Sequence, residues 1–146
     1  MDSIEGENDY FVSRDRELID YAAAAHLIIE VAAWGKAQHT GEDSVRSCID
    51  NSAWCFGVYR KAANKTEMVG IARIISDKRT FGYLCDVVIH PEHRGCGLGK
   101  QLVRAIVADE EVVSLGTLLL ITPDAHGLYR QFGFKSIDNP EMLMKR

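Results

Sequence analysis

The sequence has no long hydrophobic run, no secretory leader pattern and no metal-binding cysteine spacing. No apolar run approaches the ~20 residues that a membrane-spanning helix needs, so we expect no membrane association. The first eight residues are acidic and contain no hydrophobic segment, so we expect no signal peptide. The cysteines form no Cys-x-x-Cys pair and indicate reduced thiols of a cytoplasmic protein. They are Cys48, Cys55, Cys85 and Cys96.

An excess of positive charge is also absent. The 17 Lys and Arg residues are outnumbered by 21 Asp and Glu residues, and the formal net charge is −4. Because there is no basic patch with interleaved aromatics, no nucleic-acid partner is expected. Repeats, low-complexity tracts and linkers are missing too. The 146 residues therefore predict one domain, at residues 11–146, after a flexible tail at residues 1–10.

Hydrophobic spacing predicts an α/β chain of the α+β kind. Apolar residues recur at helical spacing between Arg14 and Trp34, with Ser13 as the expected N-cap and Gly35 as the expected stop. Apolar and β-branched runs separated by short polar turns predict an antiparallel meander, followed by a helix-and-strand crossover. The expected strands are residues 10–12, 54–59, 68–75, 80–89 and 118–122, and further helices are expected at residues 42–49 and after Gly99.

The most informative stretch is residues 84–103. It begins as a buried strand that includes Val87–Ile89, continues as a basic loop with three glycines, and ends as an amphipathic helix. The first N–H groups of a helix have no internal partner, and the helix dipole adds partial positive charge there. Glycines let an anion approach because no Cβ stands in the way. The stretch therefore predicts a phosphate site.

The spacing within this loop selects among phosphate-binding motifs. A Walker A loop would need glycine where Arg94 stands and Ser or Thr where Gln101 stands, and the last glycine interval does not fit a dinucleotide fingerprint. The pattern Arg-x-x-Gly-x-Gly does fit, as Arg94, Gly97 and Gly99. It resembles the pyrophosphate loop of the GNAT superfamily of N-acetyltransferases. The alternative is a glycine-rich turn that binds nothing.

A second stretch resembles the same superfamily. A short apolar strand at residues 118–122 is followed by Ala-x-x-Leu-Tyr and then by Gly-Phe, in the order that the superfamily shows. The matching residues are Ala125, Leu128, Tyr129, Gly133 and Phe134. The resemblance is clear over residues ~68–137 and implies a mixed, mostly antiparallel central sheet flanked by helices.

The resemblance also implies where acetyl-coenzyme A, the acyl donor, would bind. The loop should take the pyrophosphate, and the strand backbone before it should pair with the amides of the pantetheine arm. Tyr129 should lie at the sulfur. The expected contacts are Val87, Val88, Ile89, Arg94, Gly95, Cys96, Gly97, Leu98, Gly99, Lys100 and Tyr129.

Two residues are candidates for proton transfer. Tyr129 occupies the family's tyrosine position and is the expected general acid for the leaving thiolate; the alternative is a packing tyrosine. Asp86 lies in a strand where a charge needs a reason, and it could orient a cationic amine or accept its proton. A structural salt bridge or cap explains Asp86 equally well. A base is not required either, since solvent can take the proton.

Residues that could contact the acceptor are Trp34, Tyr83, Asp86 and His126. Two of them have simpler explanations: Trp34 as core, and His126 as an exposed helix residue. Tyr83 is nearer to where some relatives carry a glutamate base. His90 and His93 are three residues apart, but no third ligand motif is visible, so they are interpreted as loop residues and no metal is expected.

These patterns predict an N-acetyltransferase that moves an acetyl group from acetyl-CoA to a small-molecule primary amine, by direct attack in a ternary complex. A cationic amine is the guess that Asp86 and the acidic net charge motivate. Two alternatives remain, a non-catalytic acyl-CoA-binding regulator and a protein or peptide N-acetyltransferase. The chain is expected to be a monomer or a homodimer.

Overall fold

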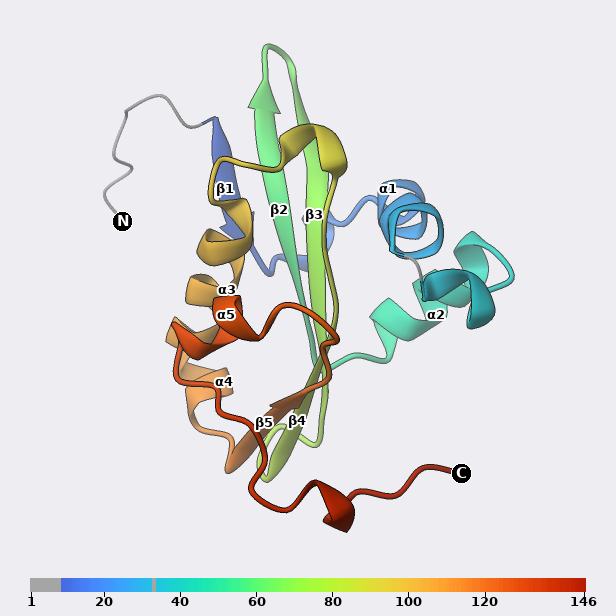
Figure 1. Ribbon diagram of the computed structural model, residues 1–146. Helices are drawn as coiled ribbons and strands as arrows, with labels where there is room; N and C mark the ends of the chain where they lie inside the picture. Colours follow the sequence, from blue (N-terminus) through green and yellow to red (C-terminus); the bar gives the residue numbers. More distant parts are fainter. Residues whose placement is uncertain (1–8, 33) are drawn as a thin grey trace.

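A five-stranded sheet forms the centre of the computed structural model, which describes residues 9–32 and 34–146 (Figure 1). The strands lie in chain order across the sheet. The first three pairings are antiparallel and the last, between β4 and β5, is parallel. The strands are β1 (Tyr10–Ser13), β2 (Trp54–Ala62), β3 (Lys65–Ser76), β4 (Phe81–Ile89) and β5 (Thr117–Leu120). The expected mixed, mostly antiparallel sheet is confirmed.

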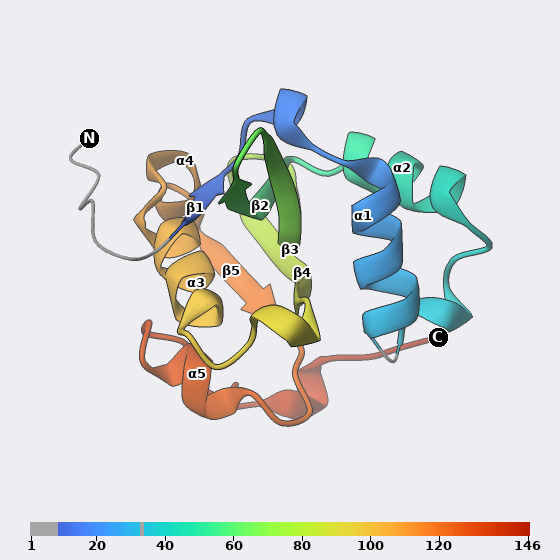
Figure 2. The ribbon, with the colours of Figure 1, turned by 90° about the horizontal axis from the view of Figure 1, so that it is seen from above.

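Helices cover both faces of the sheet (Figures 1 and 2). One face carries α3 (Leu98–Ala108), α4 (Glu110–Val113) and α5 (His126–Arg130). The other carries α1 (Tyr21–Ala25), which continues as a π-helix at His26–Val31, and α2 (Glu42–Asp50). Single 3₁₀ turns lie at Arg16–Leu18, Gly35–Ala37, Pro91–His93 and Pro140–Met142. Because α3 and α4 cross over between β4 and β5, those two strands run parallel.

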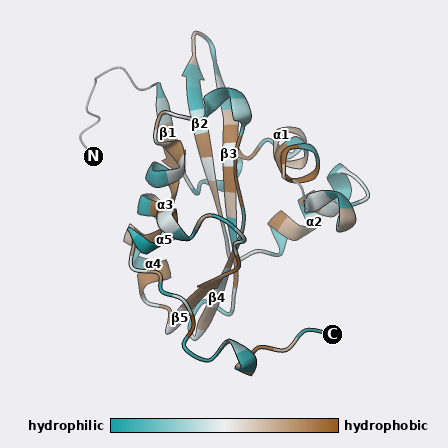
Figure 3. Cartoon of the chain, in the orientation of Figure 1, coloured by the Kyte–Doolittle hydropathy of each residue, from teal (hydrophilic) through white to brown (hydrophobic). Residues whose placement is uncertain are grey.

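Each face of the sheet has its own hydrophobic core, and the apolar strand segments stand out in brown in Figure 3. The first core lies under α3 and includes Leu84, Leu102 and Ile106. The second lies under α1 and α2 and includes Ile28, Ile49, Ile71 and Val88. Strand residues contribute alternately to the two, since successive side chains of a strand point to opposite faces.

The first helix differs from the prediction. Its α-helical part begins at Tyr21, with the Asp20 carboxylate accepting a hydrogen bond from the Ala23 N–H at 3.0 Å. Ser13 ends β1 instead of capping a helix at Arg14. The side chain of Arg16 donates to the Ser52 carbonyl at 2.6 Å, which ties the intervening turn to the start of β2. Ala33, the last apolar position of the predicted helix, lies outside the described residues.

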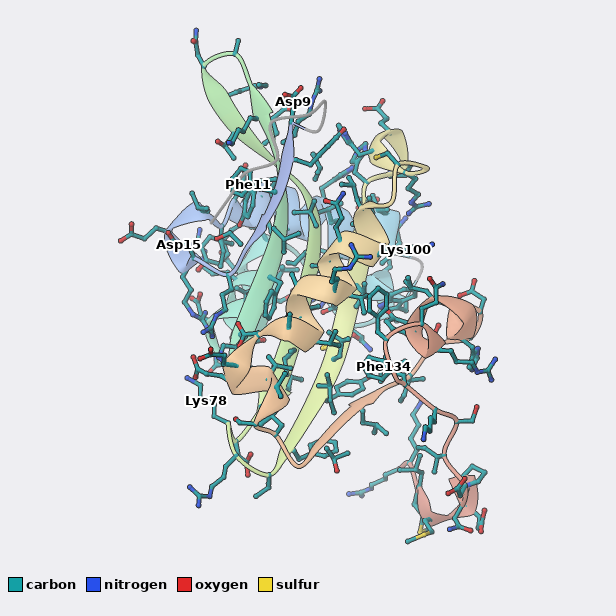
Figure 4. The ribbon with its side chains drawn as sticks, turned by 90° about the vertical axis from the view of Figure 1, so that its left-hand side faces the viewer. Asp9, Phe11, Asp15, Lys78, Lys100 and Phe134 are labelled. Atoms are coloured by element: carbon teal, nitrogen blue, oxygen red, sulfur yellow. The ribbon has the colours of Figure 1, made fainter. Side chains whose placement is uncertain are left out.

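Residues 9 and 10, which the prediction assigned to the tail, lie against the sheet. Residues 1–8 lie outside the described part of the chain. Tyr10 already pairs with Arg60, and the Lys61 N–H donates to the Asp9 carbonyl at 2.6 Å. Asp9 and Phe11 are labelled in Figure 4, next to the far ends of β2 and β3. Among the described residues, the sheet begins at Tyr10.

A bulge in β4 decides which way its side chains point. Ile71 pairs with Val88 and Arg73 with Cys85, so Ala72 alone faces both Asp86 and Val87. The extra residue reverses the alternation of side chains along β4. Leu84 and Val87 therefore both face the first core, although they are three positions apart. Asp86 lies at the reversal point, with a φ of 53°.

Candidate active site

A cavity of about 750 Å³ lies where β4, the start of α3 and α5 meet. Most of the predicted cofactor contacts line it. Val31, Ala32 and Trp34 approach it from the other layer. The lining residues are Val31, Ala32, Trp34, Val87, Val88, Ile89, Arg94, Gly95, Gly97, Leu98, Gly99, Lys100, Ala125, Leu128 and Tyr129. The fold thus brings together two motifs that are some 30 residues apart in the sequence.

The glycine loop presents bare backbone to this cavity. Gly95 and Gly97 have φ values of 84° and 81°, a region that residues with a Cβ rarely adopt. A Cβ built on either glycine would meet nothing within 4 Å, so both face open space. Gly97 directly precedes α3, whose 11 residues give the free N–H groups of its first turn a full helix dipole. An arrangement of this kind can bind a phosphate group.

Two cations flank this helix end. Arg94 folds its side chain back, and its Nε donates to the Ile89 carbonyl at 2.9 Å. Lys100 lies on the first turn of α3, which crosses in front of the sheet in Figure 4. Both residues line the cavity. Cys96 does not line it: its thiol is exposed and lies 3.2 Å from the His93 carbonyl, so any contribution from Cys96 comes from its backbone.

Beyond the bulge, β4 parts from β5. The parallel pairing covers only Phe81–Leu84 with Thr117–Leu120, and β5 then ends. Within the described part of the chain, Val87–Ile89 therefore have no partner strand on the β5 side, and these residues line the cavity. Unpaired strand groups can bind an extended ligand as an added strand would.

Tyr129 closes the opposite wall. It is buried, with 7% of its surface exposed, and its ring meets Phe134 edge-on at 5.6 Å between centroids. Burial raises the pKa of its phenol above the usual range. The hydroxyl therefore keeps its proton at neutral pH and can donate it. Phe134, from the Gly-Phe part of the motif, packs against the Tyr129 ring and helps to hold it in place.

Asp86 is engaged in a buried ion pair. Its Oδ2 accepts from the Arg73 Nε at 2.5 Å, and only 4% of its side chain and 11% of that of Arg73 are exposed. Its Oδ1 lies 3.4 Å from the indole N–H of Trp34, which donates to it. Arg73 also donates to the Ser52 hydroxyl at 3.3 Å. The sequence left two interpretations of Asp86, a structural salt bridge and a role in proton transfer. The structure shows that the salt bridge is present.

The other predicted acceptor contacts are scattered. Trp34 is 49% exposed and lines the cavity. Tyr83 is half-buried, and burial raises its pKa. It does not line the cavity. His126, exposed at the start of α5, lines a second cavity of about 490 Å³ along the edge of β5, and Tyr129 lines both cavities.

Sequence reasoning missed Arg73 and the contribution of the first helix. Arg73 is the charge within the apolar run of residues 68–75, and that isolated charge was the available signal. Val31 and Ala32 carry no local signal, because they reach the cavity only through packing against the sheet. Ala125 and Leu128 were recognised as motif residues, and the structure shows that they also line the cavity.

The N-terminus of α3 and the part of β4 beyond its pairing with β5 line one cavity, an arrangement that can bind an extended, phosphate-bearing ligand. The comparisons with known proteins identify the family. Residues 52–136 match the family model described as Acetyltransferase (GNAT) domain. A Gibberella zeae protein, named as a candidate acetyltransferase, is 32% identical over 87% of this chain and 80% of its own length. The chain belongs to the GNAT acetyltransferases.

Further similarities support this assignment. A crystal structure of a GNAT-family protein from Xanthomonas campestris superposes with a TM-score of 0.83 and 37% identity, over 97% of this chain and 94% of that one. The chain is 32% identical to an uncharacterised N-acetyltransferase of Porphyra purpurea over 62% of this chain and 52% of that protein. A Mycobacterium tuberculosis structure in complex with CoA has a TM-score of 0.67 at 16% identity and shares the fold, covering 88% of this chain and 73% of that one.

Proposed function

We propose that the protein transfers the acetyl group of acetyl-CoA to a small-molecule primary amine by direct attack in a ternary complex. The observation that carries this proposal is that the glycine loop, the part of β4 beyond its pairing with β5, and Tyr129 all line the same cavity. The GNAT family uses acyl-CoA, and these residues are those that an acyl-CoA would need. We propose in addition that the acyl group is acetyl and that the acceptor is an amine.

The order of groups along the wall suggests how the donor would lie. The pyrophosphate would bind at the N-terminus of α3 between Arg94 and Lys100. The pantetheine amides would pair with the backbone of Val87–Ile89. The amine nitrogen then attacks the thioester carbonyl carbon, the C–S bond breaks, and the products are an amide and CoA. Positioning of two reactants supplies much of the rate in such a reaction.

Tyr129 is proposed as the general acid. Its buried, protonated phenol would protonate or hydrogen-bond the leaving sulfur. We propose water as the acceptor of the amine proton, because the charge of Asp86 is already compensated by Arg73. Asp86 then acts as a positioning residue that fixes the bulge and holds Trp34. Because the charge of Asp86 no longer calls for a cationic partner, we propose only that the acceptor is a small primary amine.

The first test is calorimetric titration of acetyl-CoA into wild type, Gly97→Glu and Gly41→Glu. A Glu side chain at Gly97 places a carboxylate in the phosphate cradle and should abolish saturable binding. Gly41 also has open space around a built Cβ but lies before α2 in extended backbone, with φ of 165°, so Gly41→Glu should bind normally. No binding by wild type would refute the proposal.

The second test follows turnover of a primary-amine panel by wild type and Tyr129→Phe. We expect a loss of about 10²-fold in kcat with unchanged acetyl-CoA affinity. Because the folded-state pKa is raised above about 10, the contribution of Tyr129 should persist through neutral pH and disappear only as pH rises past 10. Equal kcat in the two proteins would leave Tyr129 as a packing residue.

The same panel separates the alternatives. Saturable acetyl-CoA binding without turnover of any amine would favour a non-catalytic regulator. Turnover of peptides in preference to free amines would favour a peptide N-acetyltransferase. Monomer and homodimer remain predictions that sedimentation can distinguish.

Location and macromolecular partners also remain predictions. Across residues 9–32 and 34–146, no helix is long and apolar enough to cross a membrane. An Arabidopsis thaliana relative, 33% identical over 47% of this chain, is named as chloroplastic. We propose a cytoplasmic location for this chain on its cysteine usage, and no nucleic-acid partner on its acidic charge balance.

A further inference from the structure

Three side chains of metal-ligand type converge at the end of β4, in the olive 3₁₀ turn beside the top of β3 in Figure 1. One ligating atom from each of His90, Glu92 and His93 lies within 4.8 Å of the other two. The sequence showed two histidines three residues apart without a third ligand. The structure supplies that ligand as the carboxylate of Glu92, which lies between them in the chain.

The local backbone explains the convergence. His90 is the N-cap of the turn, with extended backbone at ψ of 134°, and Pro91–His93 form the turn. The Nδ1 of His90 accepts from the Glu92 N–H, which holds the ring over the turn. The imidazole rings of His90 and His93 lie 5.7 Å apart between centroids. Pro91 pre-sets the backbone and makes this arrangement a property of the folded turn.

Tyr10 orients one of the imidazoles. Its hydroxyl lies 2.7 Å from the Nδ1 of His93, and the two rings meet edge-on. When His93 Nδ1 carries the proton and donates to the Tyr10 oxygen, the Nε2 of His93 has a free lone pair. Metal-bound histidines characteristically hold their second nitrogen in such an outer hydrogen bond. β1 thus braces the turn from the far side.

We propose that His90, Glu92 and His93 form a binding site for a divalent transition metal ion of the zinc and cobalt type. Two imidazoles and one carboxylate are a donor set that these ions accept, with water completing the coordination. At Zn–N distances of ~2.0–2.1 Å, two ligand atoms on a tetrahedral ion lie about 3.3 Å apart. The observed set must therefore contract, which side-chain rotation in this partly exposed turn allows.

Metal binding competes with one existing hydrogen bond. The Glu92 backbone N–H donates to His90 Nδ1 at 3.2 Å, and His90 gives up this bond whichever nitrogen it offers to the metal. The bond is long, so its loss costs little. With three protein ligands and this competition, we expect a dissociation constant on the order of 1–100 µM, weaker than structural four-ligand zinc sites.

His26 is positioned to become a fourth ligand. It is exposed in the π-helix, and its ring centroid lies 5.8 Å from that of His90. A metal held by both would link the helix at His26–Val31 to the turn that precedes Arg94. This site is separate from the proposed acetyl transfer, so its existence can be tested without measuring any turnover.

The test uses the full chain without a histidine tag, stripped with a chelator. CoCl₂ is titrated with detection of the visible absorption of the bound ion, and ZnCl₂ by calorimetry. Wild type should bind one ion, and His90→Ala and His93→Ala should each weaken binding at least tenfold. Glu92→Gln should weaken it too, because an amide oxygen is a poorer ligand. His126→Ala removes an exposed histidine elsewhere and should bind like wild type.

Two results would overturn the site. One is wild type that does not saturate below about 1 mM metal. The other is binding by His93→Ala or Glu92→Gln with wild-type affinity. Glu92 is exposed, so Glu92→Gln leaves the fold intact and decides the role of the carboxylate even if a histidine variant is destabilised. His26→Ala then distinguishes three protein ligands from four, by unchanged or weakened affinity.

Discussion

At the scale of single residues, Asp86 combines an unusual backbone conformation with a buried ion pair and a hydrogen bond from Trp34. It occupies a left-handed backbone conformation, with φ of 53°, in which a residue other than glycine is unusual. Its carboxylate is buried between Arg73 and the indole of Trp34. Aspartate tolerates this backbone better than most residues, and the ion pair fixes its direction. The bulge therefore depends on Asp86 and Arg73 together.

The isosteric change Asp86→Asn should be destabilising by about 3 kcal/mol, because it leaves the Arg73 guanidinium buried without its counter-charge. Asparagine keeps the shape, the left-handed tolerance and a hydrogen-bond acceptor for Trp34, so the loss reports the charge together with the hydrogen bond that Asp86 accepts from Arg73. The measurement is urea unfolding at neutral pH. Adding Arg73→Met to the variant should restore most of the stability, since a hydrophobic replacement of a buried pair is often neutral. No recovery in the double variant would argue against this account.

The same pair of variants bears on the acceptor site. If Asp86 only positions the bulge and Trp34, the stable double variant should show an altered KM for the amine with an unchanged pH profile of kcat. If Asp86 takes the amine proton, the acidic limb of that profile should vanish. Unchanged turnover of every accepted amine would remove Asp86 from both roles.

At the scale of elements, the strands, the crossover and the presence of the first helix could be predicted from the sequence, and the start of that helix could not. β-branched runs and short polar turns give the order of β2, β3 and β4 because those signals are local. The turn between β1 and α1 is held by Arg16, which donates to the Ser52 carbonyl 36 residues away. The bulge in β4 is equally hidden, since it is a matter of register between two strands. The pairing of Arg73 with Asp86 was hidden for the same reason, because it depends on how β3 and β4 align.

The N-cap of α1 is testable by itself. Asp20→Ala should lower the free energy of unfolding by about 1 kcal/mol, since the Ala23 N–H would lose its acceptor. Asp20→Ser should retain most of that stability, because a hydroxyl can cap the same N–H. Ser13→Ala is the matched comparison for the start that the sequence predicted, and it should cost less than Asp20→Ala. The reverse order in denaturant midpoints would contradict the observed cap.

At the scale of the whole molecule, one sheet separates two cores, and the cavity opens where the sheet divides. The first core packs α3 on one face and the second packs α1 and α2 on the other. The cavity is lined from both layers, by Tyr129 on one side and by Val31 and Trp34 on the other. The glycine loop and the tyrosine motif were predictable because each is a contiguous pattern. The wall from the first helix required the assembled fold.

Because both cores share the same strands, they should unfold as one cooperative unit, which is the prediction of a single domain at residues 11–146. Leu102→Ala in the first core and Ile49→Ala in the second each remove a fully buried side chain and should cost about 2–5 kcal/mol. Val113→Ala, at a residue that is 64% exposed, should change stability by less than about 0.5 kcal/mol. The two core changes lie on opposite faces, so their costs should add in the double variant to within about 0.5 kcal/mol.

Each variant should show one transition, with the same midpoint by circular dichroism as by tryptophan fluorescence. Two separated transitions in either core variant would mean that the layers are distinct folding units, and that a cavity lined by both is assembled only after each has folded.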